Sequence, residues 1–253
     1  MKNCLKILTV LLLSALSLAS YAADSPFFDT SRPEKPVTFG LRVGMNSSGV
    51  ATNYMDLQPE LIQSNFYWHS GYQAGAVAAL NIRKFFAVEV GAYWQHRGYD
   101  ASLMAANAVD DYMGSQFVRV RYNVITIPVT LSWKVNLQSQ TVVSFDCGPY
   151  FSYGISGKKK LDSYIAFGED EGQLVFDHTI SEPNYFNADS REFLAVQRFD
   201  VGVQMGIGFT FFKHYMLGIN YMHSLKNVAK NYEGGTDYTL RNCGWNFVMG
   251  YNF

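Results

Sequence analysis

The sequence predicts an all-β fold, an eight-stranded antiparallel up-and-down transmembrane β-barrel. Three observations lead to this prediction. Apolar residues alternate with small or polar residues along eight segments, as they do on the two faces of a β-strand. The connections between these segments are alternately short and long, as in outer-membrane barrels. Beyond the N-terminal region, no segment approaches the roughly 18 uninterrupted apolar residues that a membrane-spanning helix requires.

The N-terminus has the features of a secretory signal peptide. Lys2 and Lys6 precede an apolar run that ends at Leu18, and small residues around Ala22 form a cleavage site. The run is too short to span a bilayer, and a buried N-terminal helix is the alternative interpretation. The expected divisions are a signal peptide, an N-terminal periplasmic segment and a barrel domain: residues 1–22, 23–36 and 37–253.

The first four predicted strands each present one apolar face. Their polar or small faces contain mainly Gly, Thr, Ser, Asn and Gln. The strands are expected at residues 37–46, 72–82, 86–95 and 125–134. Their apolar faces consist of Val37, Phe39, Leu41, Val43 and Met45; Tyr72, Ala74, Ala76, Ala78, Leu80 and Ile82; Phe86, Val88, Val90, Ala92 and Trp94; and Ile125, Ile127, Val129, Leu131 and Trp133.

The other four predicted strands repeat this pattern, and the last is the most aromatic. They are expected at residues 143–153, 199–211, 215–222 and 243–253. Their apolar faces consist of Val143, Phe145, Cys147, Phe151 and Tyr153; Phe199, Val201, Val203, Met205, Ile207, Phe209 and Phe211; Tyr215, Leu217, Ile219 and Tyr221; and Cys243, Trp245, Phe247, Met249, Tyr251 and Phe253. The last strand is expected to close the barrel by pairing with residues 37–46.

The connections define the two ends of the barrel. Three are short, near residues 83–84, 136–140 and 212–213. Four are long, at residues 47–70, 98–122, 156–197 and 225–238. Since short and long connections alternate, all short turns share one end with both termini. This arrangement predicts periplasmic turns and extracellular loops.

Composition separates a membrane barrel from a soluble ligand-binding barrel. A soluble barrel needs a charged outer face, whereas the polar faces here carry few charges and suit a narrow interior filled by side chains. We therefore expect a multi-pass protein of a Gram-negative outer membrane, in contact with outer membrane lipids. The net charge of −1 gives no support for nucleic-acid binding. Cys147 and Cys243 are expected to face lipid or pack within the wall.

Several ordered pieces of sequence resemble the PorT-like outer-membrane β-barrels of Bacteroidota, eight-stranded relatives of the OmpA-like transmembrane barrel. The similar pieces cover nearly all of the chain after the signal peptide: residues 39–46, 88–91 with 97–98, 127–129, 148–150, 198–202 and 206–208. The resemblance implies an eight-stranded outer-membrane barrel. It also implies that some members take part in protein secretion and gliding.

The resemblance extends to the C-terminus, which looks like the assembly signal that such barrels present to their insertion machinery. The outer-membrane barrel assembly machinery is therefore an expected partner. The residues expected to form this signal are Trp245, Phe247, Tyr251 and Phe253.

Four charged residues are expected to project into the lumen as a polar network: Arg42, Glu89, Asp146 and Asp200. Charges inside a narrow barrel must be paired or hydrogen-bonded, because an isolated desolvated charge costs several kcal/mol. We expect Arg42 to pair with Glu89 or Asp200. The expected neighbours of the network are Gln73, Arg97, Lys134 and Gln204. A gated ion or proton path is the alternative to a structural plug.

Nothing in the sequence indicates an enzyme, a metal site or a cofactor. The five histidines lack metal-ligand spacing, and no G-x-S-x-G turn is present. His96 and His223 were compared with the Ser–His pair of barrel-type membrane lipases, and neither has a suitable serine nearby. The expected role is therefore non-enzymatic, with no cofactor.

The long connection at residues 156–197 is the main candidate for specificity. It opens with three lysines, becomes acidic, and holds six aromatic residues. A loop of this length without a function is unusual. We expect a folded cap or β-extension over the barrel mouth; binding of a partner, ligand or divalent cation is the alternative. Envelope or secretion proteins are the partners expected here.

Taken together, these features predict a structural or interaction role through the extracellular loops. Two alternatives stay open: a component of a protein-secretion or envelope-assembly apparatus, and a small-solute channel.

Overall fold

The computed structural model describes residues 29–53, 61–107, 112–138, 141–167, 175–182, 185–187, 195–230 and 238–253. The expected signal peptide, residues 1–22, lies outside the described residues. The first strand begins at Val37, where the alternation predicted it. Among the described residues, no helix has the length and apolar character needed to cross a membrane.

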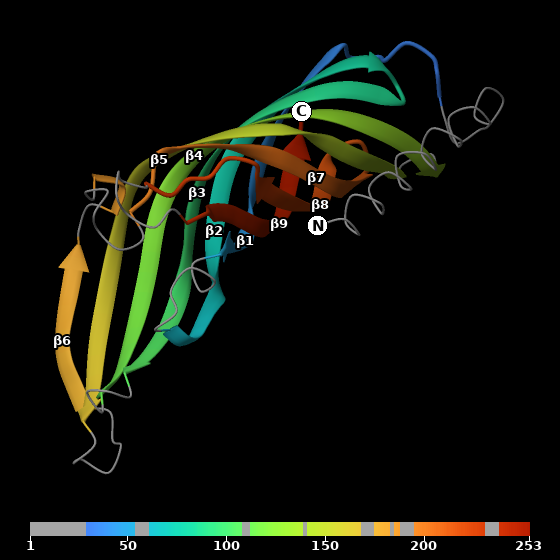
Figure 1. The fold of residues 1–253 in the computed structure, drawn as a ribbon. Coiled ribbons are helices and arrows are strands. Elements are labelled where there is room, and N and C mark those ends of the chain that lie inside the picture. The colour runs from blue at the N-terminus through green and yellow to red at the C-terminus, as the bar shows by residue number, and fades with distance from the viewer. Residues whose placement is uncertain are drawn as a thin grey trace.

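In the described part of the chain, nine antiparallel strands form one sheet, and eight of these strands close into a ring. Figure 1 shows their arrangement. The strands are β1 (Val37–Thr52), β2 (Leu61–Arg83), β3 (Phe86–Asn107), β4 (Tyr112–Gln138), β5 (Thr141–Phe167), β6 (Val175–Glu182), β7 (Phe199–Phe211), β8 (Tyr215–Ser224) and β9 (Leu240–Asn252). The order β4-β3-β2-β1-β9-β8-β7-β5, with a further β4–β5 pairing, closes the barrel. The predicted eight-stranded up-and-down barrel is confirmed, and β6 is an added strand on the edge of β5.

The first and last barrel strands pair as the sequence predicted. Val43 lies opposite Met249, and Gly40 lies opposite Asn252. Gly44 allows this close approach, because a Cβ there would lie 2.0 Å from the carbonyl oxygen of Phe247. The terminal residue continues the ladder, since the Phe253 amide donates to the Phe39 carbonyl oxygen at 2.9 Å.

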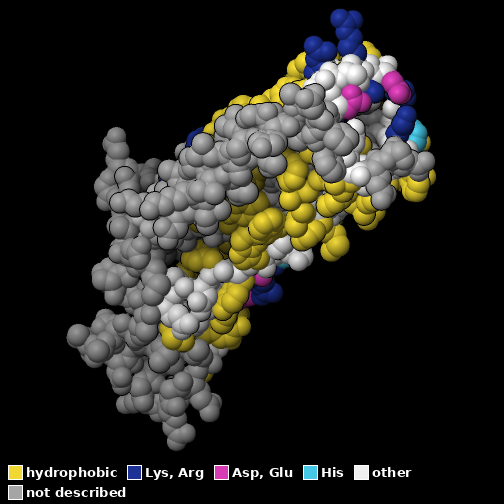
Figure 2. Space-filling view, turned by 90° about the vertical axis from the view of Figure 1, so that its right-hand side faces the viewer, with side chains coloured by type: hydrophobic (Ala, Val, Ile, Leu, Met, Phe, Trp, Pro, Cys, Tyr) yellow, Lys and Arg dark blue, Asp and Glu magenta, His cyan; other side chains and the backbone are white. Residues whose placement is uncertain are grey.

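The short turns share one end of the barrel. β7 and β8 meet at a tight turn in which Phe212 and Lys213 both have positive φ, at 53° and 66°. Such values are uncommon outside glycine, and they suit a tight hairpin connection. Near the same end, Lys84 pairs with Asp29 at 3.0 Å. Figure 2 shows Lys, Arg, Asp and Glu side chains gathered at one end of a broad band of hydrophobic side chains.

The hydrophobic band is made by the outward faces of the strands. Leu41 and Met45 of β1 are 56% and 64% exposed, whereas Arg42 between them is 3% exposed. The same contrast occurs in β9, where Phe247 is 52% exposed and Asn246 is 4% exposed. A surface that exposes its apolar side chains and buries its polar ones is stable when the surrounding medium is lipid.

Strands β2 to β5 are longer than predicted and continue past the lipid-facing band, toward the lower left in Figure 1. Much of the predicted loops 47–70, 98–122 and 156–197 is therefore strand. The physical reason is visible in β4, where Ile125 is 45% exposed and the adjacent Val124 is 4% exposed. From Ile125 toward the periplasmic end, the apolar residues of β4 face outward to lipid. From Val124 toward the extracellular end, they face inward, so the alternation of apolar and polar residues changes phase.

The extended strands build a second core outside the lipid band. Its inward residues on β3 to β5 pack against a 3-10 turn, η4 (Tyr185–Asn187), and against residues 196, 228–229 and 240. The strand residues of this core are Tyr99, Ala101, Val118, Val120, Tyr122, Val124 and Leu161. The long 156–197 connection thus contributes a strand extension and a folded cap, the arrangement expected from its length and aromatic content.

Candidate functional site: the filled lumen and the extracellular sheet

The four charged residues predicted to face the lumen lie at its two ends. Arg42 is at the periplasmic end, where its guanidinium donates to the Asn252 side-chain oxygen at 2.7 Å and to the Leu41 carbonyl at 3.2 Å. Asp200 lies at the other end of the lumen, among extracellular-side residues. The expected Arg42–Asp200 pairing is therefore wrong, because the two groups occupy different levels of the barrel.

Glu89 and Asp146 belong to the same periplasmic half as Arg42. Both are partly buried, and Glu89 lies within electrostatic reach of Asp146, Arg42 and Lys134. Asp146 accepts a hydrogen bond from Ser144 at 3.1 Å. Among the described residues, Arg42 forms no ion pair with Glu89, so the expected contact is replaced by the bonds to Asn252 and the backbone. Arg42 and Glu89 therefore attract each other electrostatically without forming a direct ion pair.

Asp200 is the centre of an extracellular-side cluster. It is 5% exposed and accepts hydrogen bonds from Ser224, from Asn242 at 2.9 Å and from Tyr150 at 3.4 Å. These donors come from β8, β9 and β5, so one carboxylate on β7 joins four consecutive strands of the ring. Three donors satisfy a buried charge that would otherwise be costly.

A network of amides and hydroxyls fills the middle of the lumen. Gln95 donates to Gln73 and accepts from Thr126 at 2.7 Å and from Arg97. Arg97 also contacts the Met222 sulfur, 3.2 Å away on the opposite wall. Gln73 and Arg97 were expected neighbours, whereas the central position of Gln95 was not predicted. The alternation along β3 could have shown from the sequence that Gln95 faces the lumen. Which residues it contacts there is visible only in the closed ring.

Two small cavities lie among the side chains of the lumen. One cavity of about 20 Å³ lies between Arg97, Tyr122, Asp200 and the cap residue Phe186. A second, of about 10 Å³, lies beside Gln73 and Gln95. Each has room for about one water molecule. Neither cavity is large enough to carry a solute through the described part of the lumen.

The cap covers the extracellular mouth. Tyr185 and Phe186 are buried, and their rings contact Tyr122 at centroid distances of 5.8 Å. Gly154 makes room for the cap, because a Cβ there would lie 2.3 Å from the Phe186 ring. The Tyr185 hydroxyl lies 3.0 Å from that of Tyr99, and burial raises the pKa of Tyr185 well above its usual value. Both hydroxyls stay protonated and join the cap to β3.

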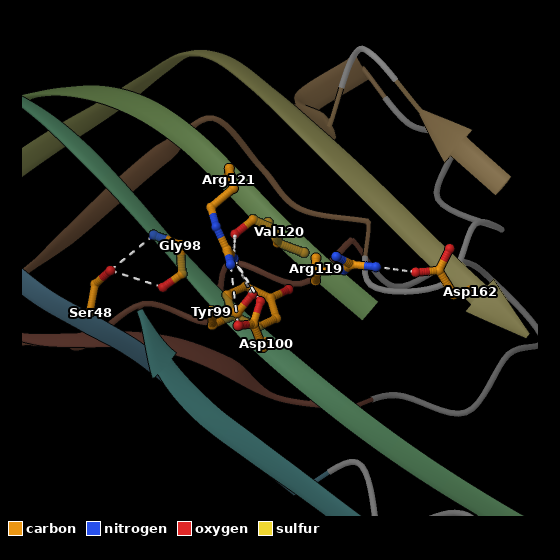
Figure 3. A network of polar contacts seen from close by, with 8 residues as sticks. All are labelled: Ser48, Gly98, Tyr99, Asp100, Arg119, Val120, Arg121 and Asp162. Carbon is orange, nitrogen blue, oxygen red and sulfur yellow. Dashed lines mark hydrogen bonds and ion pairs between the residues drawn. The ribbon is translucent and has the colours of Figure 1, made fainter. Parts of the chain in front are cut away.

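The outward face of the extracellular sheet carries charge. Arg121 forms an ion pair with Asp100 at 2.7 Å, and Arg119 forms one with Asp162 (Figure 3). Asp162 also pairs with Lys160 at 3.1 Å and accepts from Thr179 of β6 at 2.7 Å. The hydrogen bonds from Thr179 and Arg119 lower the pKa of Asp162 to about 2. This carboxylate therefore stays ionised and holds β4, β5 and β6 together.

The residues predicted to form the C-terminal signal lie on the outward face of β9 and just beyond it. Their exposed fractions are 43% for Trp245, 52% for Phe247, 39% for Tyr251 and 57% for Phe253. Tyr251 and Phe253 pack edge to face, with ring centroids 5.3 Å apart. The structure thus shows an aromatic-rich strip that Met249 interrupts, and recognition of this strip by assembly machinery stays a prediction.

The described residues contain no cluster of three or more His, Cys, Asp or Glu side chains arranged to hold a metal ion. His96, considered above as a catalytic residue, accepts or donates one hydrogen bond with Asn123 at 2.9 Å and stacks on Tyr72. His223 stacks beside Tyr221. Both histidines are thus involved in contacts on the barrel wall.

A closed ring of lipid-facing strands around a polar lumen agrees with a comparison to known families. The family model described as outer membrane protein β-barrel domain matches residues 23–230. The chain belongs to this family. Its place is accordingly the outer membrane of a Gram-negative cell, which it crosses with several strands. A search of curated proteins finds no match.

Several solved outer-membrane proteins are similar to this barrel. OprG of Pseudomonas aeruginosa has a TM-score of 0.42 at 10% identity, covering 89% of this chain and 99% of that one. Ail of Yersinia pestis, in complex with the heparin analogue sucrose octasulfate, has a TM-score of 0.36 at 12% identity, covering 87% and 100%. Neisserial surface protein A has a TM-score of 0.37 at 10% identity, covering 87% and 100%.

Proposed function

We propose that this barrel is a non-enzymatic outer-membrane protein with a structural or interaction role, carried out by its extracellular sheet. The observation that carries the proposal is the filled lumen. Arg97 reaches Met222 on the opposite wall, Asp200 joins β7 to β5, β8 and β9, and Phe186 covers the mouth, so side chains occupy the lumen of the described barrel. The surface left for function is the part of the sheet that stands above the membrane.

The edge of that sheet supports an interaction with another protein. β6 ends the strand order, and no described strand pairs with its outer edge. Its apolar residues Val175, Phe176 and Ile180 are 58%, 54% and 45% exposed. An unpaired strand edge with exposed apolar side chains is a template for an added strand from a partner. The occupant we propose is an extended segment of another envelope protein.

Two measurements test the proposal. Single-channel recording in planar bilayers should give no stable, large conductance for the purified protein; such a conductance would support the small-solute channel instead. Detergent extraction and affinity purification should recover a partner with the intact chain and lose it with the double variant Val175→Lys, Ile180→Lys. Gln116→Lys is the matched control, because it adds charge to an exposed position on β4 of the same sheet.

Recovery of the same proteins by the intact chain and the β6 variant would contradict an interaction through β6. The amide protons of β6 offer an independent check, since an added strand should slow their exchange in the complex. Faster or unchanged exchange in the presence of the recovered protein would also contradict the proposal.

The finer family assignment belongs to this proposal. The ordered pieces at residues 39–46, 127–129, 148–150 and 198–202 support a PorT-like member from Bacteroidota, exported by a signal peptide at residues 1–22. A role in a secretion or envelope-assembly apparatus is then the second candidate. A stable set of several envelope proteins in the purification would favour the apparatus, and a single partner would favour a separate interaction role.

A further inference from the structure

Four basic side chains form a cation ladder on the outward face of the extracellular sheet: Arg119, Arg121, Lys158 and Lys160. The strand register places Arg121 opposite Lys158 and Arg119 opposite Lys160. Val118 and Val120, which alternate with the arginines, are fully buried, so the ladder faces away from the cap. Arg119 and Lys160 each keep about half of their side-chain surface exposed, at 52% and 48%.

The cation ladder is only partly neutralised. Like charges directly opposite each other on neighbouring strands are unfavourable. Asp100 offsets Arg121, and Asp162 is shared by Arg119 and Lys160. Among the described residues, two carboxylates pair with the four cations of the ladder, which leaves the ladder and its partners with two positive charges. Within the described part of the chain, the Lys158 side chain has no hydrogen bond or ion pair, and the residue is exposed. The local charge therefore favours binding of an anion.

The ladder lies directly above the lipid-facing band. Ile125 of β4 and its cross-strand partner Tyr153 of β5 are 45% and 54% exposed on the same outward face. The next outward pair is Asn123 and Ser156, joined by a hydrogen bond of 3.0 Å. The pair above that one is Arg121 and Lys158 of the ladder. Figure 3 shows Arg121 and Arg119 at successive outward positions along β4.

The lower rung of the ladder, Arg121 and Lys158, lies just beyond the headgroup layer of the outer leaflet. Arg121 is four residues beyond Ile125, which is about 13 Å along the strand. With a strand tilt of about 40°, this distance corresponds to about 10 Å of height. The polar layer of a bilayer begins at the hydrocarbon edge and is about 5–8 Å thick on each side. Arginine and lysine side chains are long enough to bend back into that layer.

We propose that the cation ladder binds the phosphate groups of a phosphorylated glycolipid in the outer leaflet, of the lipid A type. Arginine binds phosphate oxygens through paired N–H groups, and lysine adds a flexible charge. A lipid in this position keeps its acyl chains against Ile125, Tyr153 and Ile155, while its phosphate reaches Lys158 and Arg121. A soluble polyanion would contact the cations alone. Continuity between the apolar band and the cations therefore favours the lipid.

Binding of defined lipids to the purified, folded protein tests this assignment. The probes are bis-phosphorylated lipid A and the same lipid with its phosphates removed, both in detergent micelles. The variant Lys158→Gln, Lys160→Gln removes two ladder charges. Each basic residue near an anionic membrane surface contributes about fivefold to affinity, so a loss of about 25-fold is expected. Lys213→Gln is the matched control, because Lys213 is an exposed lysine at the periplasmic end.

The expected result is tight binding of phosphorylated lipid A to the intact chain and to the Lys213→Gln control. Binding should weaken in the ladder variant and with dephosphorylated lipid. Equal affinity of the intact chain and the ladder variant for lipid A would overturn the proposal. A sulfated oligosaccharide that binds with the same lysine dependence, when lipid A does not, would overturn the lipid as its occupant.

A variant that fails to fold cannot decide the question, so a single substitution completes the design. Lys158→Gln alone removes a side chain with no described bond, and it should fold normally while losing about fivefold in affinity. This proposal does not depend on the β6 interaction. Loss of lipid binding with unchanged protein partners, or the reverse, distinguishes failure of one proposal from failure of the other.

Discussion

The hydroxyl groups of Tyr99 and Tyr185 lie 3.0 Å apart inside the extracellular core. Tyr99 belongs to a barrel strand, and Tyr185 belongs to the turn that covers the mouth. Both side chains are buried, at 0% and 2% exposure. This one contact therefore joins the wall to the cap over the lumen, and each hydroxyl satisfies the other where water is excluded.

Substitution of one tyrosine should cost more than substitution of both. Tyr185→Phe leaves the Tyr99 hydroxyl buried without its partner, and the free energy of unfolding should fall by about 1–3 kcal/mol. The double variant Tyr99→Phe, Tyr185→Phe removes both polar groups and should recover part of that loss. Urea-dependent unfolding in detergent or lipid measures the difference. Additive losses in the double variant would show that the two hydroxyls do not act as a pair.

Asp200 should be the lumen residue most sensitive to substitution. Asp200→Ala leaves the donors Ser224, Asn242 and Tyr150 without their shared acceptor, and a loss of about 2–4 kcal/mol in unfolding free energy is expected. Asp200→Asn retains one acceptor oxygen and should cost less. Unfolding midpoints in urea test this order. Asp146→Ala is a useful comparison, because that carboxylate is only partly buried; a larger loss there would contradict the assignment.

Acid should loosen the β5–β6 hairpin. The folded pKa of Asp162 is about 2, below its ordinary value of 3.8, so its contribution to stability is present above pH 4. That contribution is lost as the pH falls from about 4 toward 2, where the carboxylate takes up a proton. Hydrogen exchange of β6 amides should therefore accelerate across this window. In Asp162→Asn the exchange should be fast already at neutral pH and should change little between pH 4 and 2.

Removal of Phe253 should impair membrane insertion more than export. The Phe253 ring extends the aromatic strip of β9, and its amide continues the pairing with β1. Outer-membrane fractions and gel mobility before and after heating measure folded protein. Lys213→Gln serves as a substitution at the same end that leaves the strip intact. If the protein without Phe253 reached the outer membrane in normal amounts and remained heat-modifiable, Phe253 would not be part of an assembly signal.

The barrel itself could be predicted from the sequence because its determinants are local. In a lipid-facing strand, side-chain direction follows residue number, so Phe39, Leu41 and Val43 could be assigned to one face without any coordinates. Turn lengths then gave the topology. The inward positions predicted for Arg42, Glu89, Asp146 and Asp200 follow from the same alternation; Arg42 and Asp200 are 3% and 5% exposed, and the other two are partly buried.

The extracellular sheet was missed for a physical reason. Above Ile125 the outside medium is water and the inside is a packed core, so the apolar positions of β4 move from odd to even residue numbers. A search for one continuous alternation ends at that point and assigns a loop. The phase change between Val124 and Ile125 was readable in the sequence, and it coincides with the edge of the lipid band.

The sequence by itself determined the barrel, its membrane-facing surface and which residues face the lumen, since each of these depends on neighbours along one strand. Only the tertiary structure decided which residues meet. Arg42 reaches Asn252 rather than Asp200, Tyr185 reaches Tyr99, and Arg121 stands opposite Lys158. These contacts depend on ring closure and on the register between strands distant in sequence, where a shift of one residue reverses every side chain.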